Sequence, residues 1–321
     1  MIALFAACKS EEKGTRDEKI EIAVIPKGTT HEFWKSVHAG AVKAEQEFGV
    51  KIIWKGPQKE DDREQQVQVV ENFIARSVDA IVLAPLDDKA LALPVAEART
   101  RSIPVVIIDS GLSGQEFISF VATDNYKGGT LAARRLGDIL GARGKVVMLR
   151  YQEGSESTTQ REQGFLDMMR QEYPGVELIS TNQYAGPTTE TAYQRSENIL
   201  NRFSEIDGIF CPNESSTFGM LRALQDAGRA SKVKSSKAIK FVGFDSSEKL
   251  VQALRDGEIH GLVLQNPFRM GYLGVKTAVE YLMGVKVVPR IDTGVILVTA
   301  ENMDELEIKN LLMPKLSEWL E

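Results

Sequence analysis

The chain has 321 residues, of which 43% are apolar, so it can bury a large core and exceeds the size of most single domains. Its formal net charge of −6 argues against a surface that binds nucleic acid or another polyanion. Two cysteines are too few for a disulfide framework or for a zinc site. We therefore expect two domains, no metal and no nucleic-acid partner.

The first residues resemble a processing signal. Cys8 follows an apolar stretch that ends in small residues and precedes a polar stretch that runs to Lys19. This order resembles a bacterial lipobox, in which the chain is cut before a cysteine that then receives lipid, although Phe5 stands where leucine is usual and the apolar stretch is short. We expect residues 1–19 to be a signal remnant with its linker and Cys8 to be the lipid anchor, which would be the chain's only membrane contact. A disordered N-terminal segment is the alternative.

From residue 20 onward, short apolar runs alternate with amphipathic segments. The first amphipathic segment places Phe33, Val37, Ala41, Ala44 and Phe48 three or four positions apart, which predicts a helix. Strands that alternate with helices predict βαβ units and parallel sheets covered on both faces. In chain order, the predicted strands are Glu21–Pro26, Val50–Trp54, Ala80–Ala84, Pro104–Ile108, Phe117–Ala122, Lys145–Arg150, Val176–Thr181, Gly208–Cys211, Ile239–Phe244 and Gly261–Gln265.

About ten strands are too many for one ordinary sheet, and the pattern restarts near Asp124. We therefore predict an α/β fold of two similar doubly wound lobes, each with a parallel sheet. The polar final stretch from Thr299 to Glu321 shows a helical pattern and is expected to pack on the outside.

Polar and aromatic residues follow several of these strands, at the sheet edge where open parallel sheets bind ligands. They combine carboxylates, carboxamides, a guanidinium and aromatic rings. A sugar needs these groups, because each hydroxyl both donates and accepts hydrogen bonds while the ring's C–H faces pack on aromatics. The candidates for a hydroxyl-rich ligand are Lys27, His31, Phe33, Trp34, Asp109, Arg161, Asn213, Asp245 and Gln265.

These candidates have structural alternatives. Asp and Asn are favoured helix N-caps, so Asp109, Asn213 and Asp245 could simply cap helices. Phe33 could belong to a helix core, and Arg161 could form a surface ion pair. The shared site is favoured because all of the candidates lie at one edge of the sheets.

The sequence from about Ile20 to Val298 resembles the type I periplasmic binding proteins, close to the ribose- and other sugar-binding members. The most specific stretch runs from Gly208 to Gly228. Further matches are Val121–Asn125 with Gly128 and Gly129, Arg161 with Gly164 and Phe165, and Val242–Asp245.

The resemblance implies a hinge of three chain segments between the lobes, near Thr123–Asn125, Gln265–Asn266 and Val285–Pro289. The N-terminal lobe would then comprise residues 20–123 and 266–287, and the C-terminal lobe 124–265 and 288–321. It also implies a monomer without cofactor or enzymatic activity, located on the extracytoplasmic face. Such a protein closes around a sugar and delivers it to an ABC transporter permease or, as the alternative, presents it to a chemoreceptor or sensor kinase.

By the same resemblance, Phe33 and Trp34 match a pair that stacks on the sugar ring, and the polar candidates match the family's ligand set. His31 stands where asparagine is common. Two departures bear on the ligand: Ser110 replaces an arginine found in ribose binders, and Lys27 replaces a small polar residue. An aromatic residue expected near 185–187 is also absent, although Tyr184 is adjacent. The ligand is therefore left open among pentoses, hexoses, sugar alcohols and related polyols.

Two other functional classes lack their required motifs. A sugar-responsive transcription regulator needs a helix-turn-helix before the first strand, where only about nineteen residues stand. A nicotinamide-dependent dehydrogenase needs Gly-x-Gly-x-x-Gly after that strand, and Pro26–His31 does not contain it. Cys211 ends an apolar run without basic neighbours, which predicts a buried thiol and not a nucleophile. His31 has no second His or Cys nearby and is expected to form hydrogen bonds, not to bind metal.

Overall fold

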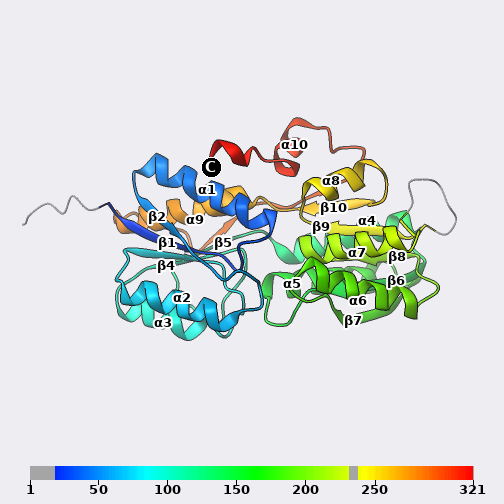
Figure 1. Cartoon of the computed structure of the whole chain (residues 1–321), viewed down its shortest axis with the longest axis horizontal. Coiled ribbons are helices and arrows are strands. Elements are labelled where there is room, and N and C mark those ends of the chain that lie inside the picture. Colours follow the sequence, from blue (N-terminus) through cyan, green and yellow to red (C-terminus); the bar gives the residue numbers. More distant parts are fainter. Residues whose placement is uncertain (1–18, 231–237, 321) are drawn as a thin grey trace, which may run out of the picture.

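The computed structural model describes residues 19–230 and 238–320, so Cys8 and the expected lipid anchor lie outside the described residues. The described chain forms two α/β lobes that lie side by side (Figure 1). Each lobe is built on a six-stranded sheet with helices on both faces. The predicted fold class, two similar doubly wound lobes, is confirmed.

The sheet of the N-terminal lobe has the order β11-β5-β4-β3-β1-β2, and every strand pair in it is parallel. Its central strands are apolar throughout because both faces are covered. One face packs on α1 (Glu32–Phe48) and α9 (Pro267–Leu282), and the other on α2 (Arg63–Ala75) and α3 (Ala92–Thr100). The strands are β1 (Glu21–Ile25), β2 (Lys51–Trp54), β3 (Ala80–Leu83), β4 (Val105–Ile108), β5 (Ser119–Ala122) and β11 (Arg290–Asp292).

The sheet of the C-terminal lobe repeats this plan in the order β12-β10-β9-β8-β6-β7, with only β12 antiparallel. One face packs on α4 (Asn125–Ile139) and α5 (Glu156–Glu172). The other packs on α6 (Thr189–Arg202), α7 (Glu214–Asp226), α8 (Glu248–Arg255) and α10 (Leu306–Leu312). The strands are β6 (Gly144–Arg150), β7 (Val176–Tyr184), β8 (Gly208–Phe210), β9 (Lys240–Phe244), β10 (Gly261–Leu264) and β12 (Ile296–Val298).

The chain crosses between the lobes after β5, after β10 and after β11. The first two crossings lie where the sequence placed them, near Thr123–Asn125 and Gln265–Asn266. The third expectation, at Val285–Pro289, was wrong, because β11 pairs with β5 in the N-terminal sheet and the crossing follows Asp292. Residues 288–292 therefore belong to the N-terminal lobe. This strand was missed because it has three residues, none of them fully buried, and no apolar run.

Glycines allow two helices to approach very closely beside the hinge. A Cβ on Gly164 of α5 would lie 2.1 Å from the carbonyl oxygen of Tyr126, and one on Gly129 of α4 would lie 1.9 Å from that of Arg161. Both distances are far shorter than van der Waals contact, so only glycine fits. These glycines, which carried part of the sequence resemblance, hold the helix that positions Arg161.

The final stretch of the chain returns to the N-terminal lobe. Helix α10 buries Ile308 and Leu312 in the core of the C-terminal lobe. The following 3₁₀ turn, Leu316–Glu318, contacts α1, and the ring centroid of Trp319 lies 6.0 Å from that of Phe268 in α9. Figure 1 shows this stretch in red above the hinge. It packs on the outside, as expected, but it also bridges the lobes.

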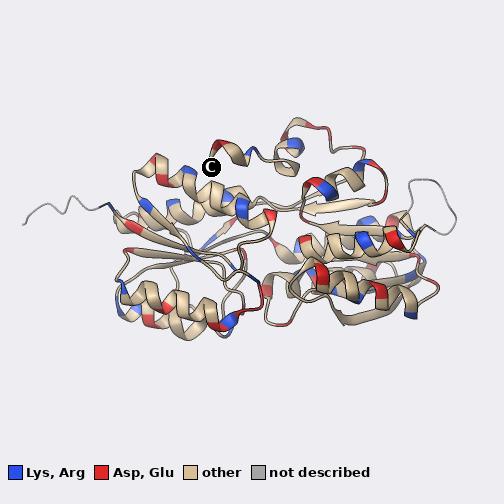
Figure 2. Cartoon of the chain, in the orientation of Figure 1, with Lys and Arg blue, Asp and Glu red and all other residues tan. Residues whose placement is uncertain are grey.

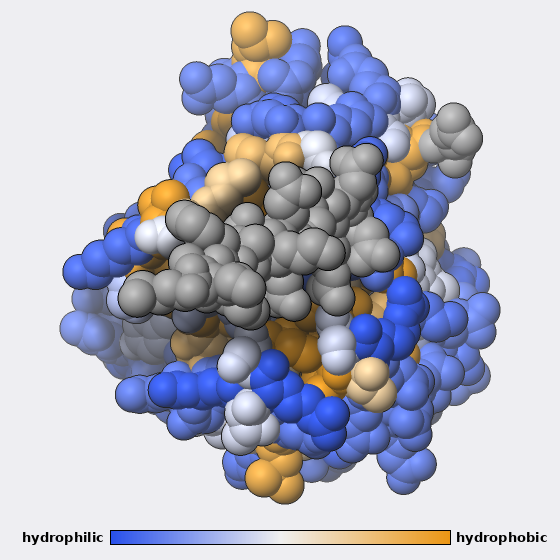
Figure 3. Space-filling model, turned by 90° about the vertical axis from the view of Figure 1, so that its left-hand side faces the viewer, coloured by the Kyte–Doolittle hydropathy of each residue, from blue (hydrophilic) through white to orange (hydrophobic). Residues whose placement is uncertain are grey.

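The described helices of each lobe carry charged residues of both signs (Figure 2). The end of the N-terminal lobe is largely hydrophilic where it is visible, with separate apolar patches (Figure 3). Among the described residues, no helix has the length and apolar character to cross a membrane.

Candidate functional site

All nine candidates from the sequence line one small cavity between the lobes, with a volume of about 30 Å³. They reach it from the carboxyl ends of the strands of both sheets, as expected for open parallel sheets. Sequence reasoning did not select six further residues of its wall, which are Glu60, Tyr151, Ser155, Ser157, Thr158 and Glu214.

Asp109 and Asp245 occupy equivalent positions in the two lobes. Each follows a central strand, has a left-handed backbone (φ 62° and 65°), and donates its N–H to the neighbouring strand, at Val121 and Val263. Neither caps a helix, so the capping alternative fails for both. It holds for Asn213, which caps α7 by accepting from Ser216 N and also lines the cavity. The two aspartates share an uncommon left-handed backbone, and both side chains line the cavity.

Lys27 and Asp109 form a buried ion pair on the N-terminal side. Lys27 Nζ lies 2.8 Å from Asp109 Oδ2, and both side chains are about 4% exposed. The same ammonium donates across the cleft to Ser157 Oγ at 3.0 Å. Lys27 therefore places a cation against Asp109, a charge that the neighbouring Ser110 does not supply.

Glu60 organises the rest of the N-terminal wall. Its carboxylate accepts from Trp34 Nε1 at 2.6 Å and from Tyr151 Oη at 2.8 Å, and lies 2.7 Å from His31 Nδ1. Burial opposes charge on both partners of the ion pair, but their mutual attraction outweighs it, raising the pKa of His31 to about 9 and lowering that of Glu60 to about 2. His31 is thus a hydrogen-bonding cation at neutral pH, and the described residues contain no cluster suited to a metal ion.

The two aromatic candidates, Phe33 and Trp34, differ in burial and in their contacts. Trp34 is 2% exposed and belongs to the core of the N-terminal lobe, with its indole N–H on Glu60. Phe33 is less buried and meets Trp34 edge-on, with ring centroids 4.9 Å apart. The core alternative therefore applies to Trp34 more than to Phe33, although both rings border the cavity.

Arg161 is buried and not part of a surface ion pair. It is 2% exposed, and it donates Nε to Asn125 Oδ1 at 2.8 Å and Nη1 to the Pro212 carbonyl at 2.9 Å. Its guanidinium carbon lies 4.0 Å from the centroid of the Phe244 ring. Asp245 Oδ2 is 3.8 Å away, too far for a hydrogen bond. Arg161 is thus held in place with only a loose charge partner.

Asp245, Gln265 and Glu214 form the C-terminal wall. Asp245 accepts from Gln265 Nε2 at 2.7 Å and from Glu214 N at 3.2 Å. Burial raises the pKa of Asp245, although Arg161 lowers it. Gln265 Oε1 is the one buried side-chain polar atom among the described residues that has no hydrogen-bond partner. Such an acceptor is costly to bury unpaired, and a ligand hydroxyl would satisfy it.

Glu214 joins this wall to the opposite lobe. Its carboxylate accepts from Phe33 N at 3.2 Å and faces the N-terminus of α1, where the partial positive charge of the helix favours an anion. Burial, together with the nearby Asp245 carboxylate, nevertheless raises the pKa of Glu214 to about 7, although His31 and the Phe33 amide lower it. With the Tyr151 and Lys27 bonds, this contact draws the two lobes together over the cavity.

The residues that sequence reasoning passed over had weak signals. Glu60 lies in the charged loop Lys55–Asp62, where its sequence context is the same as that of an ordinary surface carboxylate. Ser155, Ser157 and Glu214 belong to strand-end segments, so a rule that took every polar residue there would have found them. Cys211 is a buried free thiol, and burial raises its pKa, as expected for a structural residue.

Comparison with known proteins agrees with this architecture. A family model described as a periplasmic binding protein domain matches residues 22–286. The ribose import binding protein of Bacillus subtilis is 30% identical over 255 residues, 79% of each chain.

Two solved structures carry the same fold. A carbohydrate transporter solute-binding protein of Agrobacterium radiobacter, in complex with D-arabinose, is 36% identical with a TM-score of 0.88, covering 93% of this chain and 100% of that one. An ABC transporter solute-binding protein of Agrobacterium vitis with bound D-fucose is 36% identical with a TM-score of 0.85, covering 91% and 100%. The chain described here therefore belongs to the periplasmic binding protein family.

Proposed function

We propose that this protein captures a sugar or related polyol between its lobes and delivers it to an ABC transporter permease on the extracytoplasmic face. The observation that carries the proposal is the buried, unpartnered Gln265 Oε1 in a wall of carboxylates, because a hydroxyl-rich ligand supplies the missing donors. Relatives that bind ribose, D-arabinose or D-fucose support the ligand class.

Hinge closure is the proposed mechanism. Lys27, Glu60 and Glu214 each bond to the opposite lobe, so they stabilise the closed state and are exposed to water when the lobes part. A ligand that contacts both walls binds the closed state more tightly and shifts the equilibrium toward it. Closure removes the polar groups from water, so a sugar that lacks one hydroxyl leaves a partner unpaired and is rejected.

The ligand is proposed to differ from ribose in how it meets Asp109. Lys27 occupies the position beside this carboxylate, and Ser110 uses its hydroxyl to accept from Ser157 N at 3.1 Å. A ligand that reaches Asp109 therefore meets the Lys27–Asp109 ion pair. We therefore include other pentoses, hexoses and sugar alcohols as candidate ligands.

We further propose that the protein acts as a monomer, performs no chemistry on its ligand and is held at the membrane by lipid on Cys8. Replacement of Cys8 by Ser should then release the protein from the membrane fraction of cells that express the full chain. An unchanged distribution would contradict the anchor but not the binding function.

A sugar panel tests the binding function. Pentoses, hexoses and sugar alcohols are screened by thermal shift, because a ligand that binds only the folded state raises the melting temperature. Calorimetry then compares the wild type with Arg161→Ala, for which we expect an affinity loss of at least tenfold, about 1.4 kcal/mol. A broad panel without any shift would overturn the proposal, whereas unchanged affinity in Arg161→Ala would refute only the ligand role of Arg161.

A further inference from the structure

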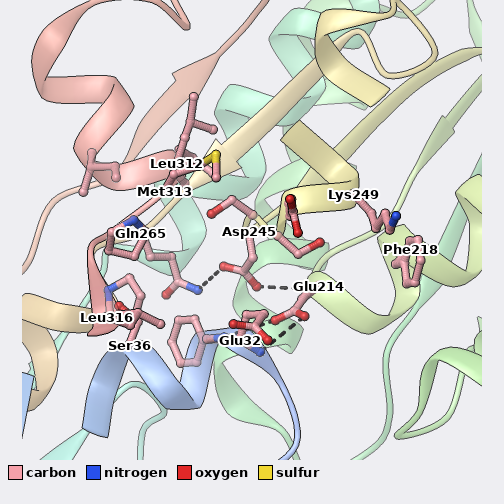
Figure 4. Close-up of a pocket in the computed structure, with 18 of the residues that line it drawn as sticks. Glu32, Ser36, Glu214, Phe218, Asp245, Lys249, Gln265, Leu312, Met313 and Leu316 are labelled. Atoms are coloured by element: carbon pink, nitrogen blue, oxygen red, sulfur yellow. Dashed lines mark hydrogen bonds between the residues drawn. The ribbon is translucent and has the colours of Figure 1, made fainter. Parts of the chain in front are cut away.

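A second, much larger cavity adjoins the interlobe site. It has a volume of about 720 Å³ and shares Phe33, Glu214, Asp245 and Gln265 with the small cavity. Figure 4 shows these shared polar groups on its floor, with Gln265 and Asp245 hydrogen-bonded to each other. The two spaces are therefore neighbours across a common wall of ligand-binding groups.

The chemistry of the second cavity changes away from that floor. The final stretch of the chain contributes the apolar side chains Leu312, Met313 and Leu316 to its lining, and Phe218 of α7 borders it as well (Figure 4). Serines, Glu248 and lysines form other parts of its lining. A polar floor, an apolar wall and some charged groups match the composition of sites for small organic molecules, and 720 Å³ falls within their usual range of about 300–1,000 Å³.

We propose that the second cavity is a subsite for a substituent on the bound sugar, so that the preferred ligand is a glycoside with an apolar or aromatic aglycone. This inference rests on the proposed function, in which the sugar ring binds between the lobes beside the shared carboxylates. The closed, ligand-free cleft of about 30 Å³ has room for about one water molecule, so the lobes stand further apart when the ring is bound. The substituent extends past Gln265 and packs against the apolar side chains of the tail. Gln265 Oε1, buried and unpartnered on the shared wall, accepts a hydroxyl of the sugar at the junction.

The arrangement also gives the tail a role in recognition. Its 3₁₀ turn contacts α1 while α10 is anchored in the C-terminal lobe, so the apolar wall is completed from both lobes. A substituent held there contacts both halves and stabilises closure together with the sugar ring.

Calorimetry with matched ligands tests the proposal. Each sugar that binds in the panel is compared with the phenyl glycosides of both its anomers and with disaccharides that contain it. We expect at least one phenyl glycoside to bind at least tenfold more tightly than its parent sugar. If free sugars bind but no phenyl glycoside gains, or only disaccharides gain, the aglycone subsite is refuted while the proposed function stands; if nothing binds, the proposed function itself fails.

Two substitutions in the tail test whether the affinity gain of the glycoside arises in the second cavity. Met313, 55% exposed, is replaced by Asp to put a carboxylate on the apolar wall, and Leu316→Ala removes apolar contact without adding charge. Met283→Asp, at a 67% exposed position outside both cavities, is the matched control. We expect the tenfold gain of the glycoside to fall to threefold or less in Met313→Asp and to decrease in Leu316→Ala, with the control unchanged. A gain that persists in both tail variants would overturn the assignment.

Discussion

The two walls of the cleft have the same backbone plan but opposite electrostatics. In the N-terminal wall each carboxylate has a cationic partner, Asp109 with Lys27 and Glu60 with His31, and the pKa of Glu60 is lowered to about 2. In the C-terminal wall, burial raises the pKa of Asp245 and brings that of Glu214 to about 7.

Because of this difference, the two walls contribute differently to ligand binding. The N-terminal wall is electrostatically complete before a ligand arrives, so it forms a rigid, preorganised surface. The C-terminal wall holds acceptors whose partners are incomplete, including Gln265 Oε1. A ligand hydroxyl therefore gains most on the C-terminal side, where it supplies a missing donor.

The largest loss of stability should come from replacing Asp109 and Asp245, the equivalent aspartates of the two lobes, with uncharged residues. Asn keeps the shape of Asp and tolerates the left-handed backbone, so Asp109→Asn and Asp245→Asn isolate the charge. Asp109→Asn leaves Lys27 buried without its counter-ion and should lower the free energy of unfolding by about 3–5 kcal/mol. Asp245→Asn should cost less, about 1–3 kcal/mol, because Arg161 keeps Asn125 and Pro212 as acceptors.

Urea unfolding of the ligand-free protein measures both values. The surface carboxylate Glu205, which pairs with Lys145 at an exposed site, provides the control: Glu205→Gln should change stability by less than about 1 kcal/mol. A larger loss for Asp245→Asn than for Asp109→Asn would reverse our ranking of the two walls.

A smaller effect, seen in affinity more than in stability, is expected for Gln265→Met. The variant removes the free acceptor and one hydrogen bond to Asp245, so the affinity for a sugar found in the panel should fall about tenfold while stability changes by about 1 kcal/mol. Calorimetry gives the first value and urea unfolding the second. Gln163→Met, on the exposed face of α5, should leave affinity unchanged. Equal losses in the two variants would show that Gln265 does not face the ligand.

The smallest effect concerns pH. Because the pKa of Glu214 rises to about 7 in the folded protein from an ordinary 4.5, the folded state retains a proton that the unfolded chain releases. Glu214 therefore destabilises the fold progressively as pH rises from 4.5 to 7. Stability from the lowered pKa of Glu60 is already present above pH 4.5, and that from the raised pKa of His31 is lost only as pH rises from 6.5 through 9.

Between pH 5 and 6.5 the contribution of Glu214 can thus be separated from that of the His31–Glu60 pair. Melting temperatures of the ligand-free wild type should fall relative to those of Glu214→Gln across this interval, because only the wild type has a buried carboxyl that must lose its proton. A difference between the two proteins that stays constant with pH would show that Glu214 does not retain the proton.

Much of the fold was encoded locally. Apolar runs located ten of the twelve strands of the described chain, and the restart near Asp124 separated the lobes. β11 was missed because it has three residues and no apolar run; β12 is apolar but equally short, and both strands are fixed by pairing with β5 and β10 and not by a helix that follows them. The misplaced third crossing follows directly from the missed β11.

Sequence by itself determined the elements, the two-lobe plan and which strand ends carry polar groups, because apolar periodicity and residue chemistry are properties of short segments. Only the tertiary structure decided which of those groups are paired. In the structure Glu60 lies at the centre of the N-terminal wall, Trp34 packs in the core and Gln265 Oε1 has no hydrogen-bond donor. These outcomes depend on burial and on partners from the other lobe, and no local pattern in a chain specifies a contact between residues more than ninety positions apart, such as Glu60 and Tyr151.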